Sequence, residues 1–277
     1  MTSAQNKGTA LITGASSGIG AVYAERLARR GYDLILVARN RDRLNTLAKR
    51  LSEATGRATE VVVADLTKSA DVARVEEVLR TDASLTLLVN NAGIGATAPL
   101  LDSHVEQMDE LIDLNVGALT RLVYAAAPAF VARGAGTIIN IGSIAGLAPE
   151  LLNGVYAASK AFVLTLSQSL QHELAPKGVR VQVVLPGAIA TDFWDTAGLP
   201  IKHLPTGIVM SADDLVDAAL AGLDLGETVT IPSLPDAFDW NQYETARRAM
   251  APGLSLSVPA QRYRGEASAK ASSGVAA

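Results

Sequence analysis

The chain of 277 residues contains no cysteine, which excludes disulfide scaffolds, zinc sites built from thiolates, and thiol nucleophiles. Aromatic residues make up only 4% of the chain and hydrophobic residues 49%, so its core must be largely aliphatic. No stretch approaches about 18 uninterrupted apolar residues, the length that a membrane span requires. Residues 1–8 are polar and lack the order of a secretory signal. We therefore expect a soluble cytoplasmic protein that does not enter a membrane.

Basic charge and metal-ligand patterns are also scarce. The formal net charge is -4, which argues against non-specific binding of nucleic acid. The three histidines, His104, His172 and His203, lie far apart and do not have the spacing of a metal site. We expect neither a nucleic-acid partner nor a metal centre.

Short apolar runs alternate with longer helical patterns along the chain. Most of these runs do not alternate with polar residues, as expected for parallel strands that helices cover on both faces. The sequence predicts an α/β fold with a doubly wound parallel sheet of about seven strands. The predicted strands are residues 9–13, 33–38, 60–64, 85–90, 136–141, 180–185 and 228–231. The predicted helices are residues 18–30, 41–55, 69–82, 105–132, 154–175, 212–225 and 239–250.

Two regions interrupt this alternation. Residues 188–210 contain two prolines, two glycines and little periodicity, which is typical of a substrate-binding loop or lid; a disordered insertion is the alternative. Residues 265–277 are rich in Ala, Ser and Gly and predict a disordered tail. Because no linker separates two domains, we predict a single domain over residues 1–264.

A glycine-rich stretch follows the first predicted strand. From Thr13 to Gly20 it reads Thr-Gly-Ala-Ser-Ser-Gly-Ile-Gly, and Gly14, Gly18 and Gly20 have no β-carbon. The backbone can therefore turn tightly and let a pyrophosphate approach the N–H groups that begin the next helix. A plain strand-to-helix connector is the alternative, because the spacing differs from the general Gly-x-Gly-x-x-Gly fingerprint.

Tyr156 and Lys160 lie four residues apart, on one face of one predicted helix. A phenol with a reference pKa of about 10 is a poor acid or base at neutral pH, and a neighbouring cation favours its ionised form. Ser143 follows the fifth predicted strand, at the edge where open parallel sheets bind ligands, and its hydroxyl could hold a carbonyl oxygen. An ordinary amphipathic pair and a plain loop serine are the alternatives.

These residues and several others resemble the motifs of the short-chain dehydrogenase/reductases, specifically their single-domain branch. The match runs from Thr9 to Thr191 in the order and approximate spacing of that family. Its parts are Thr13-Gly-x-x-x-Gly18-x-Gly20, Asn90-Asn91-Ala92-Gly93, Asn115, Ser143, Tyr156-x-x-x-Lys160 and Pro186-Gly-x-Ile-x-Thr191. The resemblance implies a Rossmann-type sheet and an oxidoreductase that transfers a hydride between a nicotinamide cofactor and a small-molecule carbonyl or secondary alcohol.

The resemblance also implies catalytic roles. Tyr156 would give a proton to the carbonyl oxygen in reduction and take one in oxidation. Lys160 would lower the pKa of Tyr156 and hold the nicotinamide ribose, while Ser143 would orient the carbonyl oxygen. Asn115, in the middle of a predicted helix, would bind a water that relays protons to Lys160.

A set of cofactor-binding residues follows from the same resemblance. Asn91, Ala92 and Gly93 would flank the adenosine, and residues 186–191 would contact the nicotinamide half. Asp65 would meet the adenine amino group, although an acid that begins a helix is an equal alternative. The set is Gly14, Ser16, Ser17, Gly18, Ile19, Gly20, Arg39, Asp65, Leu66, Asn91, Ala92, Gly93, Tyr156, Lys160, Pro186, Gly187, Ile189 and Thr191.

The end of the second predicted strand indicates which cofactor is used. After Ala38 comes Arg39, where an NAD-binding fold has an acid for the ribose 2′-hydroxyl. A guanidinium is a strong partner for a 2′-phosphate, so we predict NADP, held by Arg39 with help from Ser16 and Asn40. Ser17 stands where many NADP-using relatives have a second basic residue. Plain surface arginines at 39, 41 and 43 are the alternative.

Two other functions are possible on this fold, and the sequence argues against both. A non-catalytic NADP-sensing or scaffold protein has no chemical need for the catalytic residues, which are all present. A sugar-nucleotide epimerase generally has a larger C-terminal domain than the residues after Thr191 could form. The family resemblance favours a homodimer or homotetramer through the helices at 105–132 and 154–175. His203, Phe193 and Trp194 either line the substrate pocket or pack the lid. The aromatic side chains at 238, 240 and 243 suggest an apolar-lined pocket of undetermined shape.

Overall fold

The structure is a computed structural model that describes residues 6–264, and these residues divide into two compact units between Ser233 and Leu234. The first unit contains the sheet and the helices up to α8. The second contains helix α9 (Ala237–Ala249) and short 3-10 turns at Ala251–Gly253 and Gln261–Tyr263. This division does not test the single domain predicted for residues 1–264, which stays a prediction. The predicted tail, 265–277, lies outside the described residues.

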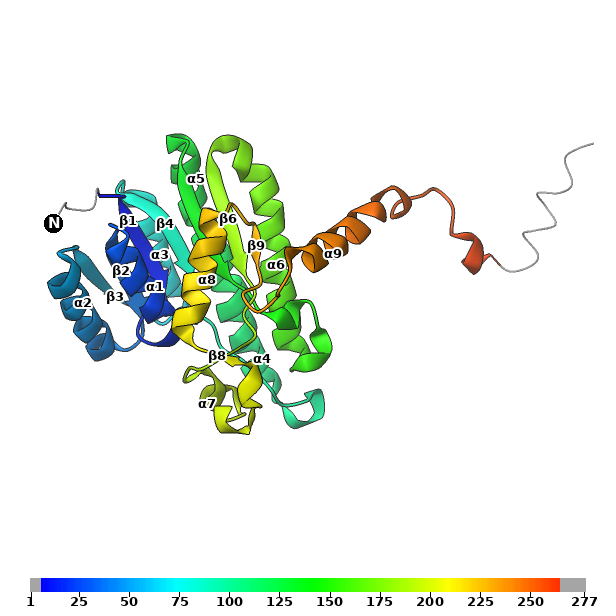
Figure 1. Cartoon of the computed structure of the whole chain (residues 1–277), viewed down its shortest axis with the longest axis horizontal. Helices are drawn as coiled ribbons and strands as arrows, with labels where there is room; N and C mark the ends of the chain where they lie inside the picture. The colour runs from blue at the N-terminus through cyan, green and yellow to red at the C-terminus, as the bar shows by residue number, and fades with distance from the viewer. Residues whose placement is uncertain (1–5, 265–277) are drawn as a thin grey trace, which may run out of the picture. The chain divides into compact units, whose positions relative to one another are not determined.

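Seven parallel strands form the sheet of the first unit, in the order β3-β2-β1-β4-β5-β6-β9 (Figure 1). Strand β1 lies between β2 and β4, so the chain reverses its direction across the sheet at β1. Such a switch point is where open α/β sheets bind ligands, outside the carboxyl ends of the strands. The strands are β1 (Thr9–Thr13), β2 (Asp33–Ala38), β3 (Thr59–Val63), β4 (Leu85–Asn90), β5 (Gly136–Ile141), β6 (Val179–Val184) and β9 (Val229–Thr230).

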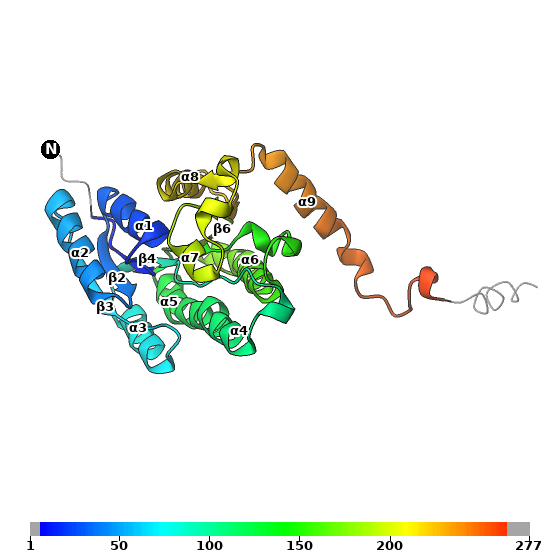
Figure 2. The ribbon, with the colours of Figure 1, turned by 90° about the horizontal axis from the view of Figure 1, so that it is seen from below.

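Helices cover both faces of this sheet, as Figure 2 shows. Helices α1, α2 and α8 pack together on one face, and α3, α5 and α6 lie on the other. The central strands are therefore buried on both sides, which explains their continuous apolar sequences. The helices of this unit are α1 (Gly18–Arg29), α2 (Arg41–Thr55), α3 (Ser69–Thr81), α4 (Val105–Ile112), α5 (Leu119–Arg133), α6 (Gly154–Leu174), α7 (Phe193–Ala197) and α8 (Ala212–Asp224). The predicted doubly wound α/β fold is confirmed.

Two differences from the sequence prediction lie close to the site. The helix predicted as one piece over 105–132 is instead α4 and α5 joined by a π-helical segment, Asp113–Ala118. The loop 188–210 contains structure that its weak periodicity does not reveal: strands β7 (Ala188–Ile189) and β8 (Val209–Met210) pair in parallel, and α7 lies between them. Because these elements are only two to five residues long, no periodic pattern can be read from them.

The stretch Val105–Arg133 spans 29 residues with a mean hydropathy of 1.3 in its most apolar window, enough by length and composition to cross a membrane. In this structure it packs as a helix on the sheet. Leu122, Val123, Ala126 and Phe130 are almost completely buried. Its apolar composition is therefore explained by its place in the core.

A buried polar chain connects the central strands to α6. The Asn90 side-chain amide donates to Asn140 Oδ1 over 2.9 Å, and the Asn140 amide donates to Ser167 Oγ over 2.9 Å. Ser167 Oγ in turn donates to the carbonyl of Val163 over 2.7 Å. These bonds join β4, β5 and α6 across the apolar layer between sheet and helix.

Candidate active site

The glycine turn between β1 and α1 is packed too tightly for a side chain. Gly14 and Gly18 have φ values of 65° and 53°, in the left-handed region that favours glycine. A β-carbon at Gly20 would overlap the carbonyl oxygen of Gly14 and lie 2.6 Å from Asn91 Nδ2. The Asn91 amide donates to the carbonyls of Thr13 (2.9 Å) and Gly14 (3.2 Å). The turn is thus fixed against the end of β4, with the start of α1 open to a phosphate.

Thr13 ties the same two strands together from the other side. Its Oγ1 accepts from the backbone N–H groups of Asn91 (2.9 Å) and Ala92 (3.0 Å) and donates to the carbonyl of Val89 (3.3 Å). Asn91 and Ala92 therefore support the glycine turn directly. Their predicted contact with adenosine stays a prediction.

Other residues near the start of α1 have structural roles as well. Ser17 is the N-cap residue of α1, although its side chain makes no capping hydrogen bond. Ile19 is half-buried and packs against the core. The Asn40 side chain accepts from Arg43 N over 3.0 Å and so caps α2. The capping bond uses the side-chain oxygen of Asn40. A phosphate would instead accept from the amide N–H groups of the same side chain.

The predicted catalytic residues meet at the carboxyl ends of β5 and β4. Ser143 follows β5, and Tyr156 and Lys160 lie one turn apart in α6, both almost completely buried. The ammonium of Lys160 donates to the carbonyl of Ile141 over 3.1 Å. Asn153 caps α6 by accepting from the N–H groups of Val155 (2.8 Å) and Tyr156 (3.4 Å). The cap fixes the first turn of α6, which carries the phenol.

Burial controls the ionisation of this pair. It raises the pKa of Tyr156 to about 12, and a hydrogen bond with Ser143 acts in the opposite direction. Burial also lowers the pKa of Lys160 to about 8. The ammonium nitrogen lies 5.8 Å from the centroid of the Tyr156 ring. The resemblance implies that Lys160 lowers the pKa of Tyr156; among the protein's own groups, burial of the phenol is the dominant influence and raises that pKa.

Asn115 lies in the π-helical segment, and its side chain is buried. Its Oδ1 accepts from Ile94 N over 3.0 Å, and its Nδ2 donates to the Ile94 carbonyl over 2.9 Å and to Ser159 Oγ over 3.3 Å. A β-carbon built at Gly93 would lie 3.0 Å from Asn115 Oδ1 and 3.6 Å from Lys160 Nζ. The structure therefore brings Asn115, Gly93 and Lys160 together, with Asn115 anchoring the strand-to-loop segment after β4. A water relay through Asn115 stays a prediction.

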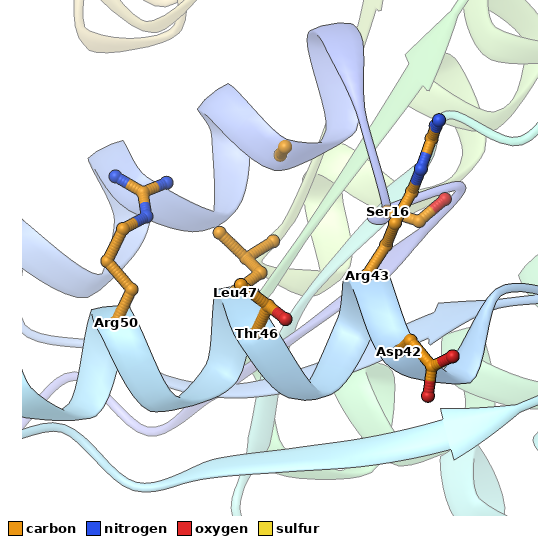
Figure 3. Close-up of a pocket in the computed structure, with 7 residues that line it drawn as sticks. Ser16, Asp42, Arg43, Thr46, Leu47 and Arg50 are labelled. Carbon is orange, nitrogen blue, oxygen red and sulfur yellow. The ribbon is translucent and has the colours of Figure 1, made fainter.

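Basic side chains gather beside the glycine turn. Arg39 follows β2, is exposed, and has no ion pair within residues 6–264. Arg43 and Arg50 of α2, together with Ser16 of the glycine turn, line a hollow of about 400 Å³ between α1 and α2 (Figure 3). Arg43 also forms an ion pair with Asp192 over 3.5 Å. From the sequence, Arg43 is considered only as an alternative surface residue; its place in the first turn of α2, four residues after Arg39, is the signal that could have placed it here.

Asp65 and Leu66 follow β3. One oxygen of the Asp65 carboxylate accepts from Thr67 N (3.1 Å) and Thr67 Oγ1 (2.8 Å), so Asp65 closes the turn that leads to α3. This favours the helix-start interpretation for that oxygen. Leu66 is 6% exposed and lines a small cavity beside Thr13 and Ala92, where it packs against the core. The predicted contacts of both residues with the cofactor stay predictions.

The segment after β6 reaches back over the glycine turn. The carbonyl of Pro186 accepts from Ile144 N over 3.0 Å, which joins this segment to the turn that holds Ser143. A β-carbon at Gly187 would be 3.8 Å from the side chain of Ile144. Thr191 lies against the glycine turn, since its methyl carbon would be 3.0 Å from a β-carbon at Gly18.

Helix α7 places aromatic side chains beside the phenol of Tyr156. The ring centroid of Phe193 lies 6.0 Å from that of Tyr156 and 5.6 Å from that of Trp194. Trp194 is buried, and its indole N–H donates to the carbonyl of Ile189 over 2.9 Å. His203 is exposed, in a short 3-10 turn. Phe193 therefore borders Tyr156, and Trp194 packs within the loop.

The comparisons with known proteins agree with this arrangement. A family model described as short chain dehydrogenase matches residues 8–199. The chain is 34% identical over 207 residues to an uncharacterized oxidoreductase of Staphylococcus epidermidis, a match that covers 72% of this chain and 88% of that protein.

Two solved structures are similar over almost the whole chain. A short-chain dehydrogenase from Sphingobium yanoikuyae in complex with NADPH is 51% identical, with a TM-score of 0.90, over 93% of this chain and 100% of that one. A bulky-bulky ketone specific alcohol dehydrogenase from Comamonas testosteroni is 47% identical, with a TM-score of 0.86, over 94% of this chain and 99% of that one. Together with the glycine turn and the serine, tyrosine and lysine at the sheet edge, these matches show that the chain belongs to the short-chain dehydrogenase/reductase family of oxidoreductases.

Proposed function

We propose that this protein is an NADP(H)-dependent oxidoreductase that interconverts an apolar ketone and its secondary alcohol, with Tyr156 as the general acid and base. One observation carries the proposal: the hydroxyls of Ser143 and Tyr156 interact at the carboxyl edge of the sheet, next to a glycine turn with no room for side chains. A carbonyl oxygen that accepts from both hydroxyls would be held and polarised there.

The cofactor part of the proposal rests on the fit of the turn to a dinucleotide. A β-carbon at Gly14 or Gly20 would meet neighbouring atoms, so these glycines let the turn pack closely against Asn91. The turn leads into the start of α1, whose first backbone N–H groups are the donors that a pyrophosphate accepts from. Arg39, Arg43 and Ser16 supply the donors that a 2′-phosphate prefers, and no acid follows β2 directly. The similar protein from Sphingobium yanoikuyae was solved with NADPH.

The proton chemistry belongs to the chain itself, whereas a bound nicotinamide supplies the hydride. A phenol whose pKa is about 12 carries its proton at neutral pH, so Tyr156 can donate that proton to a carbonyl oxygen. Lys160, with a pKa of about 8, is mostly an ammonium at neutral pH and favours the phenolate that remains. Ser143 orients the oxygen that receives the proton.

The surroundings of Tyr156 favour an apolar substrate. Tyr156 belongs to a cluster of apolar side chains in which Leu111, Ala145 and Ala157 are the other buried members, and Ile94, Ala96, Leu152, Val155 and Phe193 pack against them. The similar protein from Comamonas testosteroni is described as specific for bulky-bulky ketones. We therefore propose ketones with apolar substituents rather than sugars or acids.

The test is to follow the absorbance of NADPH while the purified protein meets a panel of ketones, aldehydes, sugars and steroids, with NADH in parallel. We expect turnover with apolar ketones and a preference for NADPH. Binding of NADPH is measured separately by fluorescence. A protein that binds NADPH tightly and reduces nothing in the panel would support the sensor or scaffold alternative instead.

A homodimer or homotetramer formed through α5 and α6, in the cytoplasm, is a further proposal. It is supported by the family and by exposed apolar side chains on these helices, Tyr124 at 71% and Phe162 at 39% exposure. A monomeric mass in light scattering at micromolar concentration would contradict the assembly.

A further inference from the structure

Gly95 and Phe193 are in closer contact than their types alone would suggest. A β-carbon built at Gly95 would overlap Cζ of the Phe193 ring and lie 2.8 and 2.9 Å from its two Cε atoms. Gly95 is not among the glycines with positive φ, so its backbone conformation is open to any residue. The lack of a side chain at position 95 is therefore explained by the ring that packs on it.

The Phe193 ring is held in this place from both ends of α7. At the start of the helix, Trp194 is anchored by its bond to the Ile189 carbonyl, and its ring meets Phe193 edge to face. At the end, Thr97 Oγ1 donates to the carbonyl of Ala197 over 2.7 Å. Helix α7 is thus bound to the segment that contains Gly95 and Thr97, and the Phe193 ring packs between Gly95 and Tyr156.

This position determines what the ring can touch. If a substrate carbonyl accepts from the hydroxyls of Tyr156 and Ser143, a substituent that lies along the Tyr156 ring would meet Phe193, whose ring centroid is 6.0 Å away. The neighbours Ile94, Ala96 and Leu152 are apolar, so a charged substituent placed against them would lose its hydration. An aromatic substituent would instead find an aromatic partner at a favourable distance.

We propose that Gly95 and Phe193 together determine substrate specificity: Phe193 contacts an aryl substituent of the ketone, and Gly95 is the residue that lets the ring reach this place. The inference rests on the proposed ketone reductase function and adds the substrate class, aryl ketones. It also predicts that the two residues act as one unit.

The test is a double-mutant cycle with Gly95→Ala, Phe193→Ala and the double variant, with NADPH as cofactor. The measured quantity is the ratio of kcat/KM for acetophenone to kcat/KM for 2-butanone. We expect Phe193→Ala to lower this ratio about 10-fold or more, since a lost apolar contact is worth roughly 10- to 200-fold in specificity. Gly95→Ala should lower the ratio by a similar factor. In the Phe193→Ala background, Gly95→Ala should change the ratio by less than about 2-fold, because residues that act through one contact are not additive.

Two further variants serve as controls for this experiment. Thr196→Ala removes an exposed hydroxyl of α7 that donates to the Phe193 carbonyl over 2.9 Å, keeps the ring, and should leave the ratio unchanged. Phe193→Leu keeps most of the volume and replaces Phe193→Ala if the smaller residue prevents folding. The proposal would be overturned if Gly95→Ala changed the kcat/KM ratio equally in the presence and absence of Phe193. It would also be overturned if Phe193→Ala left the ratio unchanged.

A second measurement separates failure of this inference from failure of the proposed function. The chain has two tryptophans, so in a Trp240→Phe background the emission comes from Trp194, which touches Phe193. Gly95→Ala should shift that emission, and Phe193→Ala should abolish the difference. If the wild type reduces no ketone but these emission shifts occur, the contact between Gly95 and Phe193 is supported, and the proposed reductase function and the substrate role of the pair are both refuted. If the wild type reduces ketones and Gly95→Ala leaves both emission and ratio unchanged, the pair alone is refuted.

Discussion

The cofactor half and the substrate half of this site are built in different ways. Residues 13–20 and 91–93 are held by hydrogen bonds to the backbone and by closely packed glycines, and a β-carbon at Gly20 would collide with the main-chain carbonyl of Gly14. Residues 188–210 are held by side-chain packing of α7, in which Phe193 and Trp194 take the central places. Backbone collisions cannot be relieved by a rotamer change, whereas side-chain packing tolerates replacements of similar volume. The first half should therefore lose its ligand after a small change, and the second should change its preference.

The largest effect should come from the junction of the two halves. Tyr156→Phe removes the proton donor and leaves the ring packing, so kcat should fall by at least about 100-fold while NADPH affinity changes by less than about 3-fold. Single-turnover assays and NADPH fluorescence titration check this. Tyr124→Phe, at a tyrosine of α5 that is 71% exposed, is the matched control and should behave as wild type. Near-normal turnover in Tyr156→Phe would remove the phenol from the mechanism.

Arg39 and Arg43 should determine whether the protein prefers NADPH or NADH. Arg39→Asp should raise the Kd for NADPH by roughly 10- to 100-fold, as expected for a lost hydrogen bond to a charged group, and should favour NADH. Arg43→Ala should act in the same direction and more weakly, because Arg43 is already paired with Asp192. Titration with NADPH, NADH and 2′-AMP distinguishes a loss of phosphate binding from unfolding. An unchanged Kd in Arg39→Asp would place the 2′-phosphate elsewhere.

A pair of glycines tests the contrast between the halves directly. Gly20→Ala should weaken NADPH binding about 10-fold, because its methyl group would meet the Gly14 carbonyl and Asn91. Gly207 lies in the substrate half with nothing within 4 Å of a built β-carbon, so Gly207→Ala should leave the NADPH affinity unchanged. Isothermal titration of both variants and the wild type is the measurement. Similar Kd values for Gly20→Ala and Gly207→Ala would contradict the idea that the glycine turn has no room.

The smallest effect should appear in the pH dependence of stability. Burial lowers the pKa of Lys160 from 10.5 to about 8, so above pH 8 the unfolded chain retains a proton that the folded one has released. The free energy of unfolding of the wild type relative to Lys160→Met should therefore rise with pH, by roughly 1 kcal/mol between about pH 7.5 and 9. Urea denaturation at both pH values measures it. A difference that falls or stays flat would show that Lys160 is not buried as an amine.

The sequence predicts the cofactor half better than the substrate half for a physical reason. Gly14, Gly18 and Thr13 occupy fixed spacings because their roles are set by the local backbone, and strand β1 begins and ends where its apolar run does. The approach of Gly95 to Phe193 joins residues that are far apart in the chain, and no local pattern encodes it. The same holds for the π-helical turn at Asn115, whose side chain forms a pair of hydrogen bonds with the backbone of Ile94, 21 residues away. The sequence does not show that Arg43 and Ser16 line the same hollow, because only the fold brings α2 beside the glycine turn.

The buried chain from Asn90 through Asn140 to Ser167 has a consequence for how α6 is aligned. Apolar side chains give a helix little preference for its position along its own axis, since a slide of one turn exchanges one aliphatic contact for another. A slide of α6 would instead leave the amide of Asn140 and the hydroxyl of Ser167 without partners in a dry layer, at the cost of a buried unpaired polar group. These bonds therefore fix the position of α6 along its axis relative to β5, and with it the position of Tyr156 relative to Ser143. The loops that follow the strands can change in sequence while the two hydroxyls keep their relative position.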